Sequence, residues 1–402
     1  MDRAMDGRLF WLAVGAFATS TMAFVFAGLL PLIAAATGVT MAEAGRLVTV
    51  YALSYAIGTP VLATLAGAAD RRRVLVAALL LFLAGVAAAG TSRSFLGLGL
   101  AQVAMGAAAG LFAATAQATA VAIAGIEHRA RAVSAVVGGT TIAVAVGAPV
   151  GALVGALFGW RATFVFIGLL AALCAVALRL GLPRGLPGVR LGLGERLLAI
   201  ARPGVLPALS TTFLYLTGSF LIISYMAPIA VEAAGLPPQA MPLMPFAFGA
   251  GAVVGNLASG RLTDRLGATR VVAFSLATSV AVALVILAIV ALLPPRVAGP
   301  LVVAVMVPWG IGGWAFPPAQ ASRIVALAPE IANLTLPLNA SAMYFGIAAG
   351  TFLGGRVLAV APADDLAPAA IPFFLAALAI VGATAITRPQ RPAAPAVCPG
   401  RT

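Results

Sequence analysis

Long apolar runs separated by short polar breaks extend along the whole chain. Each run is continuous, rich in Leu, Ala and Val, and about 20 residues long, which is the length a helix needs to cross a bilayer. Membrane β-strands would instead alternate apolar and polar residues over about 10 positions. The pattern predicts twelve membrane-spanning helices, at 9–31, 44–66, 74–91, 95–122, 132–156, 161–180, 204–231, 241–260, 271–293, 299–322, 333–358 and 369–386.

The second half of the chain repeats the first. The following pairs are each 203 residues apart: Gln117 and Gln320, Glu127 and Glu330, Gly147 and Gly350, and Gly151 and Gly354. Asp70-Arg71 and Asp264-Arg265 are 194 apart, so the copies differ in length by 9 residues (203 − 194) somewhere between these dipeptides and the glutamines. Six spans per copy start both copies on the same membrane face, which makes them parallel repeats.

The repeat predicts an all-α integral membrane fold of two six-helix bundles, at 1–180 and 204–387. A linker at 181–203 is expected to join them, and the proline-rich tail at 388–402 is expected to be disordered. Composition agrees, because 62% hydrophobic and 9% charged residues leave too little polar surface for a water-soluble globule of this size. The mean hydropathy is +1.10.

The net charge of +13 raises the question of nucleic-acid binding. With a cytoplasmic N-terminus, however, the predicted spans place 19 arginines on the cytoplasmic side and 5 on the other. This imbalance follows the positive-inside rule, so the basic residues indicate topology rather than a nucleic-acid partner. We therefore expect a multi-pass protein of the inner membrane with both termini in the cytoplasm.

Two short segments carry the same pattern, and the second is the more complete. In the second half, Gly260, Asp264, Arg265, Gly267 and Arg270 follow the spacing GxxxDRxG with a trailing basic residue. The first-half copy contains Asp70, Arg71 and Arg73, but Ala66 replaces the first glycine and no glycine follows the arginines. Both segments resemble the signature loop of the major facilitator superfamily, and Asp70 is expected to cap the third span.

In the fifth span, Gly147, Pro149 and Gly151 are similar to the glycine–proline motif of that superfamily's antiporters. Proline bends a helix, and glycines four residues apart allow a neighbouring helix to approach closely. Nearly the whole chain resembles the twelve-span bacterial drug/proton antiporters, which include sugar and purine efflux permeases. The resemblance implies a monomeric secondary transporter surrounded by lipid that exports a small molecule by alternating access, with protons as the coupling ion.

The chain departs from that pattern at two positions. Many relatives have an acidic residue midway along the first span and an arginine in the fourth, where this chain has Ala23 and Gln102. The remaining acids lie at span ends, and Glu43 is expected to pair with Arg46, a proton-relay role for Glu43 being the alternative. A site without a midspan charge favours a neutral or amphiphilic solute. The residues expected to line it are Tyr51, Tyr55, Gln102, Tyr215, Asn256, Trp309, Asn339 and Tyr344.

An enzymatic function is not expected. His128 is the only histidine, and the sequence contains no cluster that suggests a nucleophile, an acid–base pair, a metal site or a cofactor. Two other functions remain open. One is a permease for uptake or facilitated diffusion of a nutrient, which agrees with the missing charge pair. The other is a membrane sensor that does not transport, and the more complete second-half loop argues against it.

Overall fold

The computed structural model describes residues 3–125, 129–186, 188, 192, 194, 198–328 and 331–386. Within these ranges the regular structure is helical, and twelve helices are long and apolar enough to cross a membrane, as predicted. The first half contains α1 (Arg3–Thr37), α2 (Met41–Leu65), α3 (Arg71–Thr91), α4 (Phe95–Ala124), α5 (Arg129–Ile142), α6 (Ala148–Phe158) and α7 (Trp160–Gly181). Glu127, His128, Glu330 and the tail at 388–402 lie outside the described residues.

The second half contains α9 (Val205–Ile223), α10 (Met226–Pro228), α11 (Leu243–Leu266), α12 (Ala268–Leu292), α13 (Pro295–Leu327), α14 (Ala332–Leu358) and α15 (Leu366–Ile386). Two predicted spans are irregular. The fifth passes from α5 to α6 through the π-helical turn η1 (Ala143–Gly147), and the seventh ends in α10 and the turn η3 (Ile229–Ala233). Pro149 and Pro228 lie beside these turns and lack the N–H that a regular helix requires.

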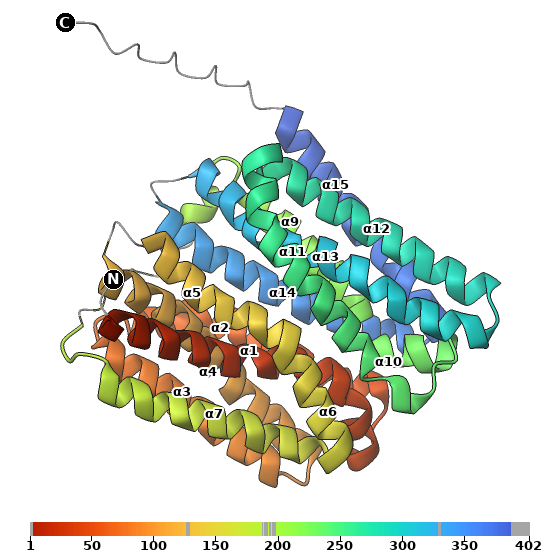
Figure 1. Cartoon of the computed structure of the whole chain (residues 1–402), viewed down its shortest axis with the longest axis horizontal. Coiled ribbons are helices and arrows are strands. Elements are labelled where there is room, and N and C mark those ends of the chain that lie inside the picture. Colours follow the sequence, from red (N-terminus) through yellow and green to blue (C-terminus); the bar gives the residue numbers. More distant parts are fainter. Residues whose placement is uncertain are drawn as a thin grey trace, which may run out of the picture.

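Helices of the same half pack mainly on one another, and the two groups meet along a boundary that we call the seam. Figure 1 shows the first half, red to yellow-green, on the lower left and the second half, green to blue, on the upper right. The seam is formed mainly by α2 against α14, and by α11 against η1 and α6. We call the membrane face on which α1 begins the near face and the opposite face the far face.

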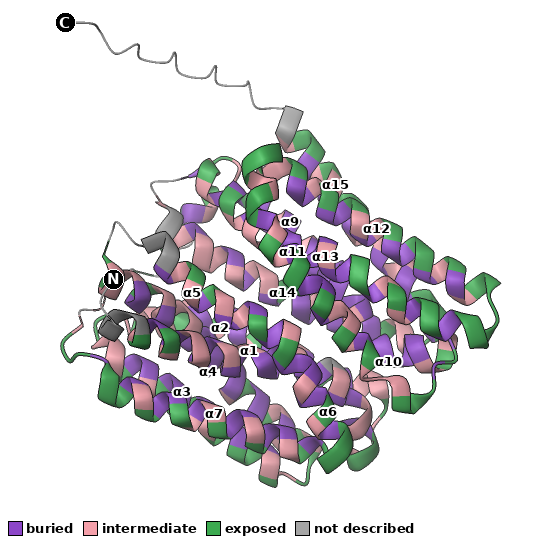
Figure 2. Ribbon diagram, in the orientation of Figure 1, coloured by how far each residue is buried: buried purple, intermediate pink, exposed green. Residues whose placement is uncertain are grey.

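Burial follows the arrangement expected of helices in lipid. Buried positions face the interior of each group, whereas exposed positions lie on the outer surface (Figure 2). Many of the exposed side chains are large and apolar, such as Leu169 at 67% and Leu257 at 68% exposure. Apolar exposure on this scale would be unusual for a protein in water and suits a surface in contact with acyl chains.

The glycines 203 residues apart make equivalent contacts in the two halves. A methyl group at Gly147 would collide with Thr21 of α1, the first helix of its half. A methyl group at Gly350 would collide with the backbone carbonyl of Thr217 in α9, the first helix of the second half. The sequence repeat is therefore also a repeat of packing, in which small residues allow helices to approach closely.

Candidate functional site

Two tyrosines from opposite halves stack at the centre of the seam. The rings of Tyr55 in α2 and Tyr344 in α14 lie 3.5 Å apart between centroids and 13° from parallel. Tyr55 is the 15th of 25 residues in its helix, and Tyr344 is the 13th of 27. Since both positions are close to midspan, the stack lies near the depth of the bilayer centre. Both side chains are buried.

A second aromatic group also joins the halves. Phe24 of α1 lies 6.2 Å from Phe220 of α9 and 5.9 Å from Trp314 of α13, measured between ring centroids. Phe24 and Trp314 are only partly buried. These three residues were not among those predicted to line the site, although aromatic side chains within the predicted spans were a signal that could have identified them.

The seam is closely packed on both sides of the tyrosine stack. Toward the near face, α2 and α14 enclose a cavity of about 10 Å³, which has room for about one water molecule. The cavity is lined by Thr59, Pro60, Leu334, Pro337, Leu338 and Ser341. Toward the far face, Tyr225 packs against Gly45 of α2 and donates a hydrogen bond to the carbonyl of Thr351 in α14 at 2.8 Å. The two helices are therefore in contact along most of their length.

Gln102 of α4 is a buried amide without a hydrogen bond. Its side chain is fully buried, and neither Nε2 nor Oε1 has a partner among the described residues. One helical turn further along, the Cα of Gly106 packs on the backbone carbonyl of Tyr51 in α2. Buried amides are normally satisfied, so Gln102 is an exception that requires a function or costs stability.

Tyr51 and Tyr215 hydrogen-bond within their own halves. The hydroxyl of Tyr51 donates to the carbonyl of Thr19 in α1 at 3.2 Å. The hydroxyl of Tyr215 donates to the carbonyl of Gly313 in α13 at 3.1 Å, and its ring stacks on Phe316 with 4.0 Å between centroids. These contacts fix both rings.

Trp309, Asn256 and Asn339 also lie within the second half. Trp309 is buried against the edge of Phe248. The amide oxygen of Asn339 accepts a hydrogen bond from the Thr212 hydroxyl at 2.7 Å. Asn256 is half-buried on α11.

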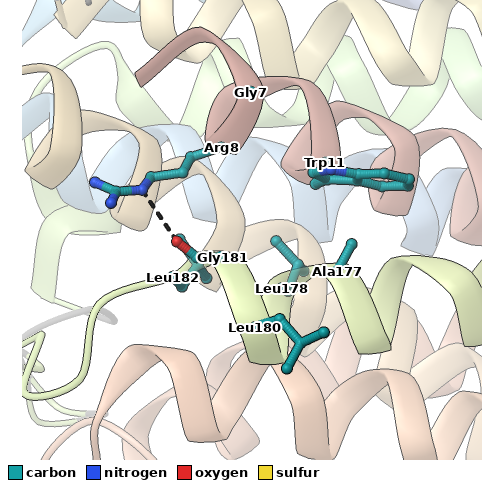
Figure 3. Close-up of a pocket in the computed structure, with 8 residues that line it drawn as sticks. All are labelled: Gly7, Arg8, Trp11, Ala177, Leu178, Leu180, Gly181 and Leu182. Atoms are coloured by element: carbon teal, nitrogen blue, oxygen red, sulfur yellow. Dashed lines mark hydrogen bonds between the residues drawn. The ribbon is translucent and has the colours of Figure 1, made fainter. Parts of the chain in front are cut away.

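Of the eight predicted residues, Tyr55 and Tyr344 meet across the seam. None of the eight lines the small seam cavity or a larger cavity of about 460 Å³ between α1 and α7 (Figure 3). Their role in binding a substrate stays a prediction.

A buried arginine on α13 extends a polar network in the second half. Arg323 is 6% exposed and donates to the Oε1 of Gln320 at 3.5 Å and to the hydroxyl of Thr384 at 2.6 Å. The amide of Gln320 donates in turn to the carbonyl of Ala208 and to the hydroxyl of Thr212. The sequence repeat identified Gln320, but Arg323 was counted only among the 19 arginines expected on the cytoplasmic side. Ionisable groups within membrane helices are commonly functional.

The turn η1 brings the glycine–proline motif to the seam. Because Pro149 has no N–H, it cannot donate to the carbonyl of Ala145 four residues before it. That carbonyl faces Gly249 of α11, where an added methyl carbon would lie 2.9 Å from the oxygen. On its other side, Gly151 packs on Val25 of α1. The motif thus combines a bend with two close helix contacts.

The family model of the Major Facilitator Superfamily matches residues 12–360. The chain belongs to this superfamily. Its members are transporters and not enzymes, so the chain is a multi-pass membrane transporter.

Named relatives and a solved structure agree with this assignment. The chain is 29% identical over 348 residues to the "Uncharacterized MFS-type transporter YbcL" of Bacillus subtilis (strain 168), covering 87% of this chain and 88% of that protein. It is 28% identical over 347 residues to the "Inner membrane transport protein YdhP" of Escherichia coli (strain K12), covering 86% and 87%. The crystal structure of the human organic anion transporter MFSD10 (TETRAN) is similar in fold, with a TM-score of 0.73, 18% identity and coverage of 95% and 100%.

In the transporter's first signature segment, Asp70 caps α3 as predicted and also holds the segment after α7. Its Oδ1 accepts the N–H of Arg72 at 2.8 Å, and its Oδ2 accepts the N–H of Gly185 at 2.6 Å. Burial raises the pKa of this carboxyl, but hydrogen bonds from Gly185, Arg72 and Arg73, and the charge of Arg73, outweigh burial and lower the pKa below its usual value. The shortened loop therefore binds the start of the predicted linker.

The neighbouring arginines strengthen this attachment. The backbone N–H of Arg71 donates to the carbonyl of Leu186 at 3.2 Å, and the Arg71 guanidinium donates to the carbonyl of Ala118 in α4. The guanidinium of Arg72 donates to the carbonyl of Arg179 in α7. The segment thus joins the near-face ends of α3, α4 and α7.

We expect Asp70→Ala to lower the free energy of unfolding by about 1 kcal/mol, the usual effect of losing an N-cap. It should also speed hydrogen exchange at the amide of Gly185, which mass spectrometry can follow. Because folding lowers the pKa of Asp70, its stabilisation is complete above the unfolded pKa of about 3.9 and is lost as the pH falls through the folded pKa. Protection of Gly185 should therefore decrease in that acidic range.

Ser94→Ala is the matched control, because Ser94 caps α4 through the N–H of Gly97 at the far face. It should lower stability similarly without changing exchange at Gly185. Unchanged protection of Gly185 in Asp70→Ala would show that the carboxylate does not hold this segment.

The second signature segment differs from the prediction of a loop. Gly260, Asp264 and Arg265 belong to α11, which ends at Leu266, and the turn itself is Gly267 with φ of +86°. Gly260 is not a point of close helix approach, since an added methyl group there would meet nothing within 4 Å. Arg270 is exposed in the first turn of α12. Only Gly267 requires the conformational freedom of glycine.

Glu43 caps a helix and does not form the expected ion pair. Its carboxylate accepts hydrogen bonds from the N–H and the hydroxyl of Thr40, both at 3.0 Å, and the N–H of Glu43 donates to the Thr40 hydroxyl at 3.2 Å. This is a capping box at the start of α2. In the described part of the chain no ion pair joins Glu43 to Arg46, because capping holds the carboxylate on Thr40.

Proposed function

We propose that this transporter exports a small neutral or amphiphilic solute across the inner membrane by alternating access, acting as a monomer with both termini in the cytoplasm. The observation that carries the proposal is the uncharged aromatic centre of the seam. Tyr55 and Tyr344 meet there, and Phe24, Phe220 and Trp314 form a second aromatic contact between the halves. Aromatic faces bind apolar and amphiphilic molecules, whereas a buried ionic group would require a compensating charge.

The arrangement of charges supports the same class of solute. Among the described residues, Arg323 is the charged side chain that is buried, and it donates hydrogen bonds to Gln320 and Thr384 within the second half. The acids of the described chain lie at helix ends. Movement of the two bundles, 1–180 and 204–387, about the seam would separate Tyr55 from Tyr344 and expose their rings to a solute.

Gln102 provides a specific prediction. If its amide binds the solute, Gln102→Leu should reduce transport by at least tenfold while raising the free energy of unfolding by about 1 to 2 kcal/mol, because leucine removes two unsatisfied polar groups at similar volume. Flux into proteoliposomes and the denaturation midpoint in detergent would measure the two effects.

Gln320→Leu is the control, because the Gln320 amide is buried but bonded to Ala208 and Thr212. It should lower stability by about 1 to 3 kcal/mol. Full transport by Gln102→Leu would show that the amide does not contact the solute.

The function itself is tested by a solute screen followed by flux. Thermal-shift profiling of the purified protein against drugs, sugars, nucleosides and amino acids should yield neutral or amphiphilic hits. Everted vesicles containing a pH-sensitive dye should then show proton movement that depends on the hit solute, as expected for proton antiport. A hit that binds but is never transported would favour the sensor function and overturn the proposal.

Facilitated diffusion or uptake of a nutrient is the second candidate. The capping role of Glu43 favours it, because this carboxylate on a first-half helix is already used structurally. Counterflow of labelled solute in the absence of an ion gradient, with no proton movement, would identify this function. Proton movement that survives Glu43→Gln would instead show that coupling uses another residue.

A further inference from the structure

A groove between α1 and α7 lies at the near face, away from the seam. We call it the α1/α7 groove; it has a volume of about 460 Å³ and is lined by Gly7, Arg8, Trp11, Ala177, Leu178, Leu180, Gly181 and Leu182. Figure 3 shows these residues coming from the first turns of α1 and the last turns of α7. The groove has no role in the proposed transport.

Arg8 presents a fixed guanidinium in this groove. Its Nε donates to the carbonyl of Gly181 at 3.0 Å. Gly181 is the last residue of α7, where carbonyls lack partners within the helix, so this bond both caps α7 and orients Arg8. Figure 3 shows the two terminal nitrogens directed away from Gly181, and within the described chain they have no hydrogen-bond acceptor. Two parallel N–H groups of this kind match a phosphate or carboxylate.

The groove next to Arg8 has an aromatic wall and open space. Trp11 lies one turn further along α1 and faces Ala177 and Leu178 across the groove in Figure 3. Methyl groups added at Gly7 or Gly181 would meet nothing within 4 Å. Tryptophan is enriched at the level of lipid headgroups, so this wall is at a depth where headgroup and acyl chain join.

An exposed apolar stripe on α7 leads from the groove into the membrane. It consists of Val165, Leu169, Leu173, Val176 and Leu180, with exposures of 59%, 67%, 54%, 56% and 79%. Their spacing of three or four residues places them on one helix face, and Leu180 also lines the groove. A ligand whose anionic group binds Arg8 can therefore place an apolar chain along this face.

From these features we propose that the α1/α7 groove binds one anionic phospholipid. The phosphate contacts the terminal nitrogens of Arg8, the glycerol region packs on Trp11, and an acyl chain follows the α7 stripe. A free phosphate or a soluble phosphate ester would use Arg8 alone and leave the apolar surface uncovered. The stripe is the reason to assign the site to a lipid.

Native mass spectrometry of the full-length protein in detergent tests the assignment with phosphatidylglycerol, phosphatidylcholine and soluble glycerol phosphate. We expect one phosphatidylglycerol to bind about fivefold more tightly than phosphatidylcholine, the effect of about one arginine at a membrane surface. Arg8→Gln should remove this preference. Gly7→Leu should weaken the binding of both lipids, because the leucine side chain fills the groove. Glycerol phosphate should not bind detectably.

Arg179→Gln is the matched control, because Arg179 is exposed in the last turn of α7 and does not line the groove. This variant removes one positive charge at the same membrane face as Arg8→Gln does. It should keep the preference for phosphatidylglycerol over phosphatidylcholine. The proposal would be overturned if both arginine variants lost the preference for phosphatidylglycerol equally, or if Arg8→Gln kept it. It would also be overturned if glycerol phosphate bound as tightly as phosphatidylglycerol. Melting temperatures in phosphatidylcholine alone should match wild type, which shows that the variants are folded.

Discussion

Gly45→Ala should reduce transport by at least tenfold, and Tyr225→Ala in the same chain should restore much of it. A methyl carbon at Gly45 would collide with the hydroxyl of Tyr225 and lie 2.8 Å from its Cζ. The tyrosine cannot easily move, because it is fully buried and its hydroxyl bonds to the carbonyl of Thr351. Strain of about 2 kcal/mol would shift the equilibrium away from this closed far face by about thirtyfold.

The closure depends on glycines from both halves, which explains why a small change has a large effect. A methyl group at Gly354 would lie 2.7 Å from the ring of Tyr225, and one at Gly355 would lie 2.7 Å from its hydroxyl and 3.2 Å from the carbonyl of Ala42 in α2. The ring therefore fills a space between α2 and α14. In alternating access, a far face that cannot close halts the cycle.

Flux and thiol labelling of Ala42→Cys together measure this effect. Labelling from the far face should become faster in Gly45→Ala and return toward the original rate in the double variant. Gly90→Ala is the control, since Gly90 is also near the far-face end of its helix and a methyl group there meets nothing within 4 Å. Normal flux in Gly45→Ala would show that the contact between Gly45 and Tyr225 is not part of the cycle.

Gly310→Ala should lower the free energy of unfolding by about 3 kcal/mol. The added methyl group would collide with the carbonyl of Phe248 and lie 2.8 Å from the N of Ala252 and 3.0 Å from the Cα of Gly251. All three atoms belong to the backbone of α11, so α11 and α13 would have to separate. Because glycine lets these helices approach closely, the separation would reduce packing along the whole crossing.

Gly382→Ala on α15 is the matched control for stability. Gly382 is exposed, and a methyl group there meets nothing within 4 Å, so alanine should raise stability by about 0.5 to 1 kcal/mol through its better helix propensity. Denaturation in detergent would compare the two variants. Similar midpoints for both would show that the crossing of α11 and α13 tolerates extra volume.

Individual residues show why the site was harder to predict than the fold. Tyr55 and Tyr344 were selected as separate aromatic residues near midspan, but their stacking depends on how α2 and α14 are rotated toward each other. Phe24, Phe220 and Trp314 were missed because each resembles ordinary packing until the halves are brought together. The sequence could not indicate these contacts, since they join residues that are far apart in the chain.

Local chemistry produced errors of another kind. Glu43 and Arg46 have the spacing of a helical ion pair, but Thr40 is three residues before Glu43 and provides two hydrogen bonds at the helix start. A cap satisfies backbone groups that a surface ion pair leaves unpaired, so the cap is formed. Asp70, which precedes its helix directly, was correctly predicted as a cap.

The sequence alone determined the class of protein, the twelve membrane helices and the parallel repeat. A bilayer requires each spanning segment to be apolar and to satisfy its own backbone hydrogen bonds, so these properties can be recognised segment by segment. Only the tertiary structure decided which aromatic side chains meet at the seam, which glycines touch a neighbouring backbone and where a groove opens to lipid. Those features depend on helix rotation and crossing, which arise from packing among residues distant in sequence.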